Sequence, residues 1–321
     1  MLASCLMAGC GFNRDKAVDH YVNALSKHEA SLDDDAILEL QEAVKWDHEF
    51  SLAHSMMGDL YREKGQYDEA AGAYETACEL DPWAFSDHLN LGQVYQILKR
   101  FTEAINVLKR ACELQPDSSE ANYTLGMCYF ETEKYTEAAR FCKKASDLAP
   151  DDSNILSSLG DIYRESDDQY NAITAYKQAL EVDPGQVDVM IRLGTAYINL
   201  KRYGPARLIL DKAVAAKPDK PEPYIALGYC LLSQKDPKGA LEAYRKGSEL
   251  DPDSYKSLNG MGVSSMMLYL SDRENKQLVR QALDHWHKSL EVNSDQPKIR
   301  KLVDRYIQEL SSGGNGSSES P

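Results

Sequence analysis

A glycine recurs every 34 residues through most of the chain. The series is Gly58, Gly92, Gly126, Gly160, Gly194, Gly228 and Gly262. Tyrosine follows the first five of these glycines by three residues, alanine follows the first six by twelve, and proline follows the same six by twenty-four. A fixed period of about 20 to 50 residues marks repeat architectures, in which each unit buries its apolar face by stacking on its neighbours. The sequence therefore predicts an array of small units rather than one globular core.

Each unit reads as two antiparallel helices, A and B. The recurring Gly and Ala residues are expected where the two helix axes approach closely, because a larger side chain would hold them apart. Aromatic residues such as Tyr67 and Phe101 begin helix B and fill the space between neighbouring units. The proline ends helix B because it cannot continue a helix and restricts the residue before it.

This set of residues resembles the tetratricopeptide repeat (TPR), and the resemblance covers residues 17 to about 296. It implies an all-α fold, a right-handed superhelical TPR solenoid of about eight helix-turn-helix repeats with a C-terminal capping helix. With the glycine counted as position 8, the repeats are 17–50, 51–84, 85–118, 119–152, 153–186, 187–220, 221–254 and 255–296. The last repeat contains about eight extra residues, which we expect near residues 271–275.

The two ends of the chain differ from the repeats. Apolar residues in 297–310 recur with helical spacing opposite charged ones, which predicts an amphipathic helix that caps the open end of the solenoid. Residues 311–321 are rich in Ser and Gly and are expected to be disordered.

Residues 1–16 resemble the second half of a bacterial lipoprotein signal followed by a linker. Met7-Ala-Gly-Cys10 and Leu2-Ala-Ser-Cys5 both match the small-residue pattern before a lipidated cysteine, and polar sequence follows Cys10. The resemblance implies a lipid anchor on Cys10 and a location in the bacterial cell envelope, facing the periplasm. The basic segment that normally begins such a signal is missing, and five further cysteines suit a reducing compartment. A cytoplasmic location, with a chance match at Cys10, remains the alternative.

Charge and motifs bear on which chemistry is expected. The formal charge of −15 argues against a nucleic-acid partner, since phosphate binding relies on clustered Lys and Arg. Phosphate-loop, nucleophile-elbow and EF-hand patterns are absent, and no Cys or His spacing matches a metal site. We therefore predict no enzyme activity, cofactor, metal or small-molecule substrate.

In the TPR family, helix A lines the concave groove, mainly through positions 2, 5, 9, 12 and 13. In repeats 2 and 5 these positions are charged, in repeat 4 they form an aromatic stripe, and in repeats 6 to 8 they are apolar. The residues assigned to the groove are Asp59, Arg62, Tyr123, Met127, Phe130, Asp161, Arg164, Ile191, Ile198, Ile225, Tyr229, Leu232, Val263, Met266 and Met267.

The predicted function is a non-enzymatic scaffold that binds a peptide or helix of a partner protein in this groove. An apolar groove suits an amphipathic partner, and methionine adapts its shape to it. Together with the leader, the resemblance is to bacterial TPR lipoproteins that assemble cell-envelope complexes. Two alternatives stay open: a cytosolic TPR adaptor or co-chaperone without a lipid anchor, and a structural protein that self-associates.

Overall fold

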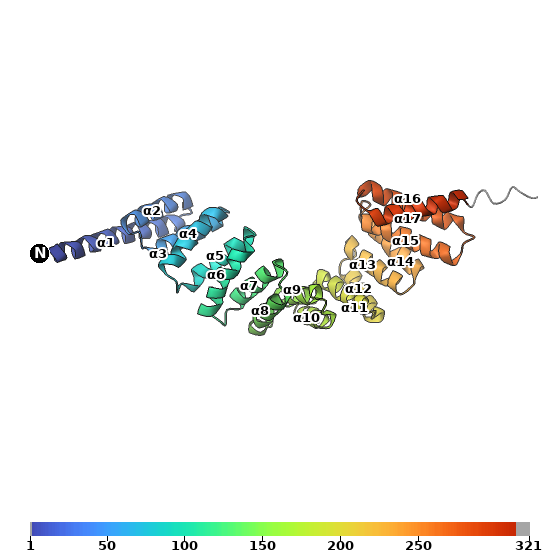
Figure 1. The fold of residues 1–321 in the computed structure, drawn as a ribbon, viewed down its shortest axis with the longest axis horizontal. Coiled ribbons are helices and arrows are strands. Elements are labelled where there is room, and N and C mark those ends of the chain that lie inside the picture. Colours follow the sequence, from blue (N-terminus) through green and yellow to red (C-terminus); the bar gives the residue numbers. More distant parts are fainter. Residues whose placement is uncertain (1, 313–321) are drawn as a thin grey trace, which may run out of the picture. The chain divides into compact units, whose positions relative to one another are not determined.

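The computed structural model describes residues 2–312, and the side chains of residues 13–310. This part of the chain forms seventeen α-helices and no β-strand, which confirms the predicted all-α solenoid (Figure 1). The helices are α1 (Leu2–Glu29), α2 (Asp33–Trp46), α3 (Ser51–Glu63), α4 (Tyr67–Leu80), α5 (Phe85–Ile97), α6 (Phe101–Leu114), α7 (Ser119–Glu131), α8 (Tyr135–Leu148), α9 (Ser153–Glu165), α10 (Gln169–Val182), α11 (Val187–Asn199), α12 (Tyr203–Ala216), α13 (Pro221–Ser233), α14 (Pro237–Leu250), α15 (Tyr255–Ser271), α16 (Lys276–Val292) and α17 (Pro297–Ser312). Residues 313–321 of the predicted disordered tail lie outside the described part.

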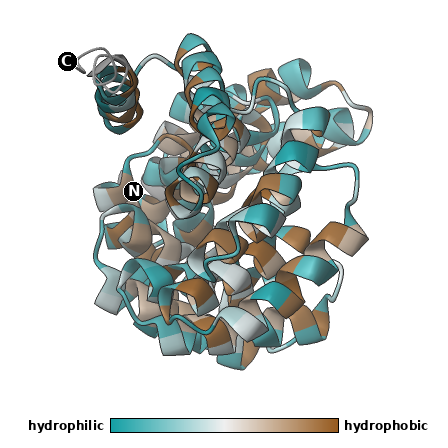
Figure 2. Ribbon diagram, turned by 90° about the vertical axis from the view of Figure 1, so that its right-hand side faces the viewer, coloured by the Kyte–Doolittle hydropathy of each residue, from teal (hydrophilic) through white to brown (hydrophobic). Residues whose placement is uncertain are grey.

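The chain divides into two compact units, residues 1–155 and 156–321. Within each unit the most extensive contacts join helices that are consecutive in sequence, such as α1 with α2 and α15 with α16. Apolar and polar residues alternate along individual helices, as expected where each helix buries one face (Figure 2). None of the helices among the described residues is long and apolar enough to span a membrane.

The middle repeats have one regular geometry. In each, helix A has 13 residues and helix B has 14, as in α3 and α4 of the first unit or α11 and α12 of the second. The turn between them places position 15 at positive φ, near +60° to +70°. Glycine occupies this position only in repeat 2, as Gly65 with φ +72°, whereas repeat 5 has Asp167 with φ +63°.

The glycines that recur every 34 residues, called here the glycine ladder, each leave room for a side chain from helix B. A Cβ added to Gly58 would lie 2.6 Å from the ring of Tyr74, and one added to Gly160 would lie 2.5 Å from the ring of Tyr176. The same position of helix B, sixteen residues after the glycine, provides Leu108, Cys142, Leu210 and Tyr244 in the other regular repeats. The close approach inferred from the sequence is therefore a specific contact between position 8 and position 24.

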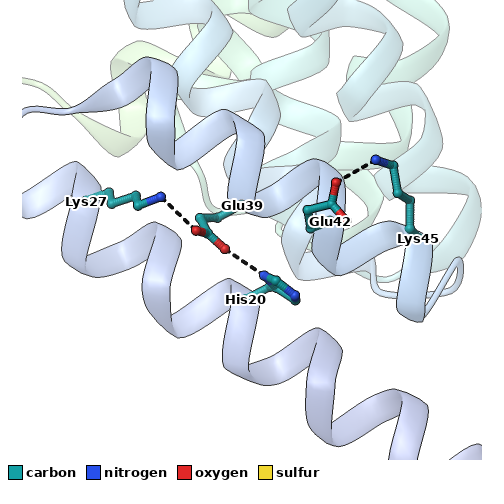
Figure 3. Close-up of polar contacts among 5 residues, drawn as sticks. All are labelled: His20, Lys27, Glu39, Glu42 and Lys45. Atoms are coloured by element: carbon teal, nitrogen blue, oxygen red, sulfur yellow. Dashed lines mark hydrogen bonds and ion pairs between the residues drawn. The ribbon is translucent and has the colours of Figure 1, made fainter.

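A cluster of charged residues links α1 and α2, the first helix pair. Glu39 of α2 accepts a hydrogen bond from Lys27 at 2.7 Å and lies 2.6 Å from His20, both residues of α1 (Figure 3). Hydrogen bonds from His20 and then Lys27 lower the pKa of the Glu39 carboxyl. The helix α1 continues from Leu2 to Glu29 without a break at the predicted boundary after residue 16. The side chain of Cys10 lies outside the described side chains.

The eighth repeat is longer because both of its helices are longer. The helices α15 and α16 have 17 residues each, and a four-residue turn joins them, so only part of the insertion falls where it was expected. Trp286 lies over Gly262, which keeps the contact of the regular repeats. The capping helix α17 adds Val303 and Tyr306 to the core around Trp286.

Candidate functional site

The charged groove positions of repeat 2 form a hydrogen-bonded network. Asp59 accepts hydrogen bonds from the Tyr74 hydroxyl at 2.5 Å and from the Asn90 amide at 3.3 Å. Arg62 donates to Asn90 Oδ1 at 3.0 Å and lies 3.4 Å from Asp59. Tyr74 is completely buried, and this burial, followed by the bond to Asp59, raises the pKa of its hydroxyl. Asp59 therefore accepts a hydrogen bond from the buried tyrosine that packs over Gly58.

The charged positions of repeat 5 form the equivalent network. Asp161 accepts hydrogen bonds from the Tyr176 hydroxyl at 2.7 Å and from the Arg192 guanidinium at 2.6 Å. Arg164 lies 3.7 Å from Asp161 and 2.8 Å from Glu165. In both repeats, a predicted groove aspartate joins helix A, helix B and the next repeat.

The aromatic stripe of repeat 4 lies on α7. Tyr123, Met127 and Phe130 are all partly buried. The ring of Phe130 lies 5.9 Å from that of Tyr135, the first residue of α8. These side chains are thus shared between the packing of the repeat and its surface.

Two of the apolar residues assigned to the groove are buried by the chain itself. Ile198 of α11 is only 5% exposed and packs with Leu210 and Cys230. Met266 of α15 is also 5% exposed and packs in the core that α17 completes. The expectation that these two side chains meet a partner is corrected: the groove positions of the TPR family placed them on the concave face, but they did not reveal the neighbouring helices that cover them.

The remaining apolar residues of repeats 6 to 8 stay at least partly accessible. Ile191, Ile225, Leu232, Val263 and Met267 are partly buried. Tyr229 on α13 differs from them, because 49% of it is exposed. It occupies position 9, where repeats 2 and 5 have Asp59 and Asp161. The C-terminal unit therefore presents an exposed aromatic ring with aliphatic neighbours on its own helix.

The cysteines outside residues 1–16 do not have the properties of reactive thiols. The five described cysteines are unpaired; Cys128, Cys142 and Cys230 are buried, and the other two are partly buried. Burial raises the pKa of Cys112 to about 11 and that of Cys142 to about 12. They therefore remain protonated at neutral pH and act as small apolar residues.

One group of polar side chains was missed by sequence reasoning. His28 at the end of α1, Asp33 at the start of α2 and Glu63 at the end of α3 bring potential ligand atoms within 4.8 Å of one another. Spacing along a single segment does not reveal this group, because the three residues come from three different helix ends. A 2.8 Å hydrogen bond joins His28 and Asp33, and it is the main cause of the raised pKa of His28. Surface groups of this composition also occur in proteins without a metal, so we describe the trio as a polar contact between the first helices.

The helix pairs, the glycine contacts and the repeat period define a TPR solenoid protein, a class of protein-interaction scaffold. The family model described as the Cilia and flagella-associated protein 70 C-terminal domain matches residues 14–260. The chain therefore belongs to this TPR family. A comparison with curated proteins gives no match.

Solved structures of bacterial and other TPR proteins have similar folds. The chain is 27% identical to MamA, with 52% of this chain and 91% of that one covered and a TM-score of 0.51. The C-terminal part of a TPR repeat-containing protein from Cytophaga hutchinsonii is 19% identical, with 71% and 89% covered and a TM-score of 0.60. YrrB, described as a TPR protein with an unusual peptide-binding site, is 19% identical, with 59% and 97% covered and a TM-score of 0.52. The last two likenesses concern the fold alone.

Proposed function

We propose that the protein binds a short segment of a partner protein along the A helices of repeats 6 to 8, with Tyr229 as the central anchor. The observation that carries this proposal is the exposure of Tyr229 at a position that repeats 2 and 5 use for internal hydrogen bonds. Tyr244 still lies over Gly228, so this repeat keeps the internal contact while its position 9 faces solvent. An exposed aromatic ring with aliphatic neighbours is typical of interaction anchors.

The surroundings of Tyr229 favour an apolar partner segment. Ile225 and Leu232 lie four residues before and three residues after Tyr229 on α13, and therefore on one side of that helix. Both also pack partly against the core of repeats 7 and 8, so their positions are fixed before binding. A partner with apolar residues at helical spacing matches this arrangement.

Paired substitutions test this groove. Tyr229→Ala combined with Leu232→Ser is expected to weaken binding of a purified partner at least tenfold, because truncation of an aromatic anchor costs about 2 kcal/mol or more. Tyr170→Ala is the matched control, since this tyrosine is 70% exposed but lies on helix B of repeat 5. Circular dichroism should show unchanged helix content in both variants. Equal affinity of the double variant and the wild type would overturn the groove assignment.

We also propose that the protein is located in the cell envelope. The small residues before Cys10 support a lipid anchor there, and the scaffold would then hold its partner at the membrane. Cys10→Ala should move the protein from the membrane to the soluble fraction, whereas Cys5→Ala should not. A soluble wild-type protein without lipid, as measured by mass spectrometry, would favour the cytosolic adaptor. Concentration-dependent sedimentation without a partner would favour the self-associating protein.

A further inference from the structure

An apolar hollow, separate from the proposed groove, lies on the helix-B side of the C-terminal unit. The helices α10 and α12 form its walls, and Leu193 and Tyr197 of α11 contribute to its lining. Its volume is about 260 Å³, and Leu180, Leu208 and Ile209 contribute further apolar surface. This hollow belongs to repeats 5 and 6, and none of the residues assigned to the concave groove lines it.

The apolar surface of the hollow is a local departure from the repeat. Leu208 occupies position 22 and is 63% exposed. The same position is glycine or polar in the other regular repeats, which have Gly72, Asn106, Arg140, Thr174 and Glu242. Packing of helix B therefore does not require an apolar residue there. Leu180 is a smaller departure, since its position holds the smaller residues Cys, Ser or Val in the other regular repeats.

Two lysines at the hollow have no internal partner. Lys177 and Lys212 form no ion pair or hydrogen bond among the residues whose side chains are described. In repeat 4, Lys143 occupies the position of Lys177 and binds Asp147. Glu181 takes the position of Asp147 in repeat 5 and also lines the hollow, but it forms no ion pair with Lys177 among the described side chains. In repeat 7, Lys246 occupies the position of Lys212 and lies 2.7 Å from Glu249. Repeat 6 has Ala215 in place of that last glutamate. With Lys177 and Lys212 against Glu181, the lining of the hollow carries a net positive charge in a chain whose net charge is −15.

We propose that this hollow binds a short apolar segment of a partner protein that carries a carboxylate beside its apolar residues. The volume lies below the range of about 300–1,000 Å³ that is usual for small-molecule sites, and it suits a pair of aliphatic side chains. The carboxylate of the segment pairs with Lys177 or Lys212, since charge complementarity selects the partner and its register. This site goes beyond the proposed groove, because it lies on the other helix of the repeat and prefers an acidic segment. The protein thus has a surface for a second partner, or for a second segment of the same one.

Peptide selection tests the proposal with no need to identify the partner first. The full chain is used to select from a displayed library of random 12-residue peptides, and peptides that also bind the Leu208→Thr variant are removed. Threonine is the residue of repeat 5 at this position, and Leu208 is mostly exposed, so the variant keeps the fold. The enriched peptides are expected to contain two apolar residues next to Asp or Glu. Failure to enrich any peptide, or enrichment of Lys and Arg, overturns the proposal.

Affinity measurements then assign the contacts. For a fluorescent enriched peptide, Lys212→Gln should weaken binding about fivefold or more and should also reduce the dependence of binding on salt. Leu38→Thr is the control, because Leu38 is 57% exposed on α2 of the other unit. Tyr229→Ala should leave this affinity unchanged even where it abolishes binding in the groove, so the two sites fail separately. Loss of self-association or of binding to anionic vesicles in Leu208→Thr, with no peptide enriched in the selection, assigns the hollow to a second copy or a lipid surface and overturns the proposal.

Discussion

Repeats 2 and 5 build the same polar network with one different residue. In both, an aspartate at position 9 binds a buried tyrosine at position 24, and an arginine follows at position 12. The fourth member comes from position 6 of the next repeat, and it is Asn90 in one network and Arg192 in the other. The two networks are 102 residues apart in sequence and lie in different units.

The comparison shows which residue of the network can vary. Asn90 is neutral, so Arg62 binds its amide oxygen and stays close to Asp59. Arg192 supplies a positive charge directly to Asp161, and Arg164 makes its shorter contact with Glu165 instead. Both networks keep the aspartate, which accepts the hydrogen bond of the buried tyrosine hydroxyl, whereas its partner from the next repeat differs. Charges that the sequence suggested for partner binding are therefore first of all part of the repeat interface.

The largest effect should follow from filling the space that the tyrosine ring occupies. Gly58→Ala and Gly160→Ala each place a methyl group about 2.5 Å from ring atoms, and we expect a loss of roughly 1–3 kcal/mol in unfolding free energy from overpacking. Because repeats contact only their neighbours, the damaged unit should melt before the other one. Calorimetry measures both effects. Gly72→Ala is the control, since nothing lies within 4 Å of its added Cβ. A shift in Gly72→Ala as large as in the other two variants would contradict the ring contact.

The next largest effect should follow from loss of the aspartate that accepts the tyrosine hydrogen bond. Asp161→Ala leaves the Tyr176 hydroxyl without its acceptor and Arg192 without its ion pair, so we expect a loss of about 1–3 kcal/mol in urea unfolding. Asp59→Ala should cost less, because its partner Asn90 is neutral. Asp161→Asn keeps an acceptor oxygen and should recover part of the loss. If Asp161→Asn and Asp161→Ala are equally unstable, the hydrogen bond to the tyrosine is not what position 9 provides.

Sequence reasoning predicted the repeat period, the helix pairs and the small residues at position 8, because periodic packing leaves a periodic pattern. It did not predict the burial of Ile198 and Met266, since their cover comes from neighbouring helices. The insertion was expected in the loop, but it lengthens α15 and α16 because extra turns of helix preserve the contact of Trp286 with Gly262. The unpaired Lys212 could have been found by a comparison of the repeats with one another, because repeat 6 has Ala215 where the other regular repeats have an acidic residue.

The same two regions should also differ in how their stability depends on pH, and this effect should be smaller. Asp87 lies beside the first network, is only 5% exposed and binds Ser55, whereas repeat 6 has Val189 at this position. Burial raises the pKa of the Asp87 carboxyl, and the charges of Asp59 and Asp81 raise it further. The folded state thus holds this proton more tightly than the unfolded state does. Its contribution to stability is present below the unfolded pKa and is lost as pH rises through the folded pKa.

Replacement of Asp87 should remove this pH dependence. Asp87→Asn keeps a polar group near Ser55 but does not ionise, so the variant should gain stability relative to the wild type as pH rises above about 4. Urea unfolding of the two proteins between about pH 3 and pH 7 measures the difference. Asp68→Asn is an exposed control on α4 that should follow the wild type. Parallel curves for wild type and Asp87→Asn would rule out a buried carboxyl with a raised pKa.

The smallest effect should distinguish Asn90 from Arg192, the residues that the next repeat contributes to the two networks. The pair of Arg192 with Asp161 is partly exposed, with 40% of the arginine side chain accessible, so its net contribution should be about 0.2–1 kcal/mol. Added salt should weaken it, whereas the neutral bond between Asn90 and Asp59 should respond less. The exchange Arg192→Asn, which copies repeat 3 into repeat 6, should therefore lower the salt dependence of unfolding of the C-terminal unit. The opposite exchange, Asn90→Arg, should introduce a salt dependence in the N-terminal unit, although Arg62 beside it opposes a second positive charge. If both exchanges leave the salt dependence unchanged, Arg192 acts through its contacts rather than its charge, and the two networks are energetically the same.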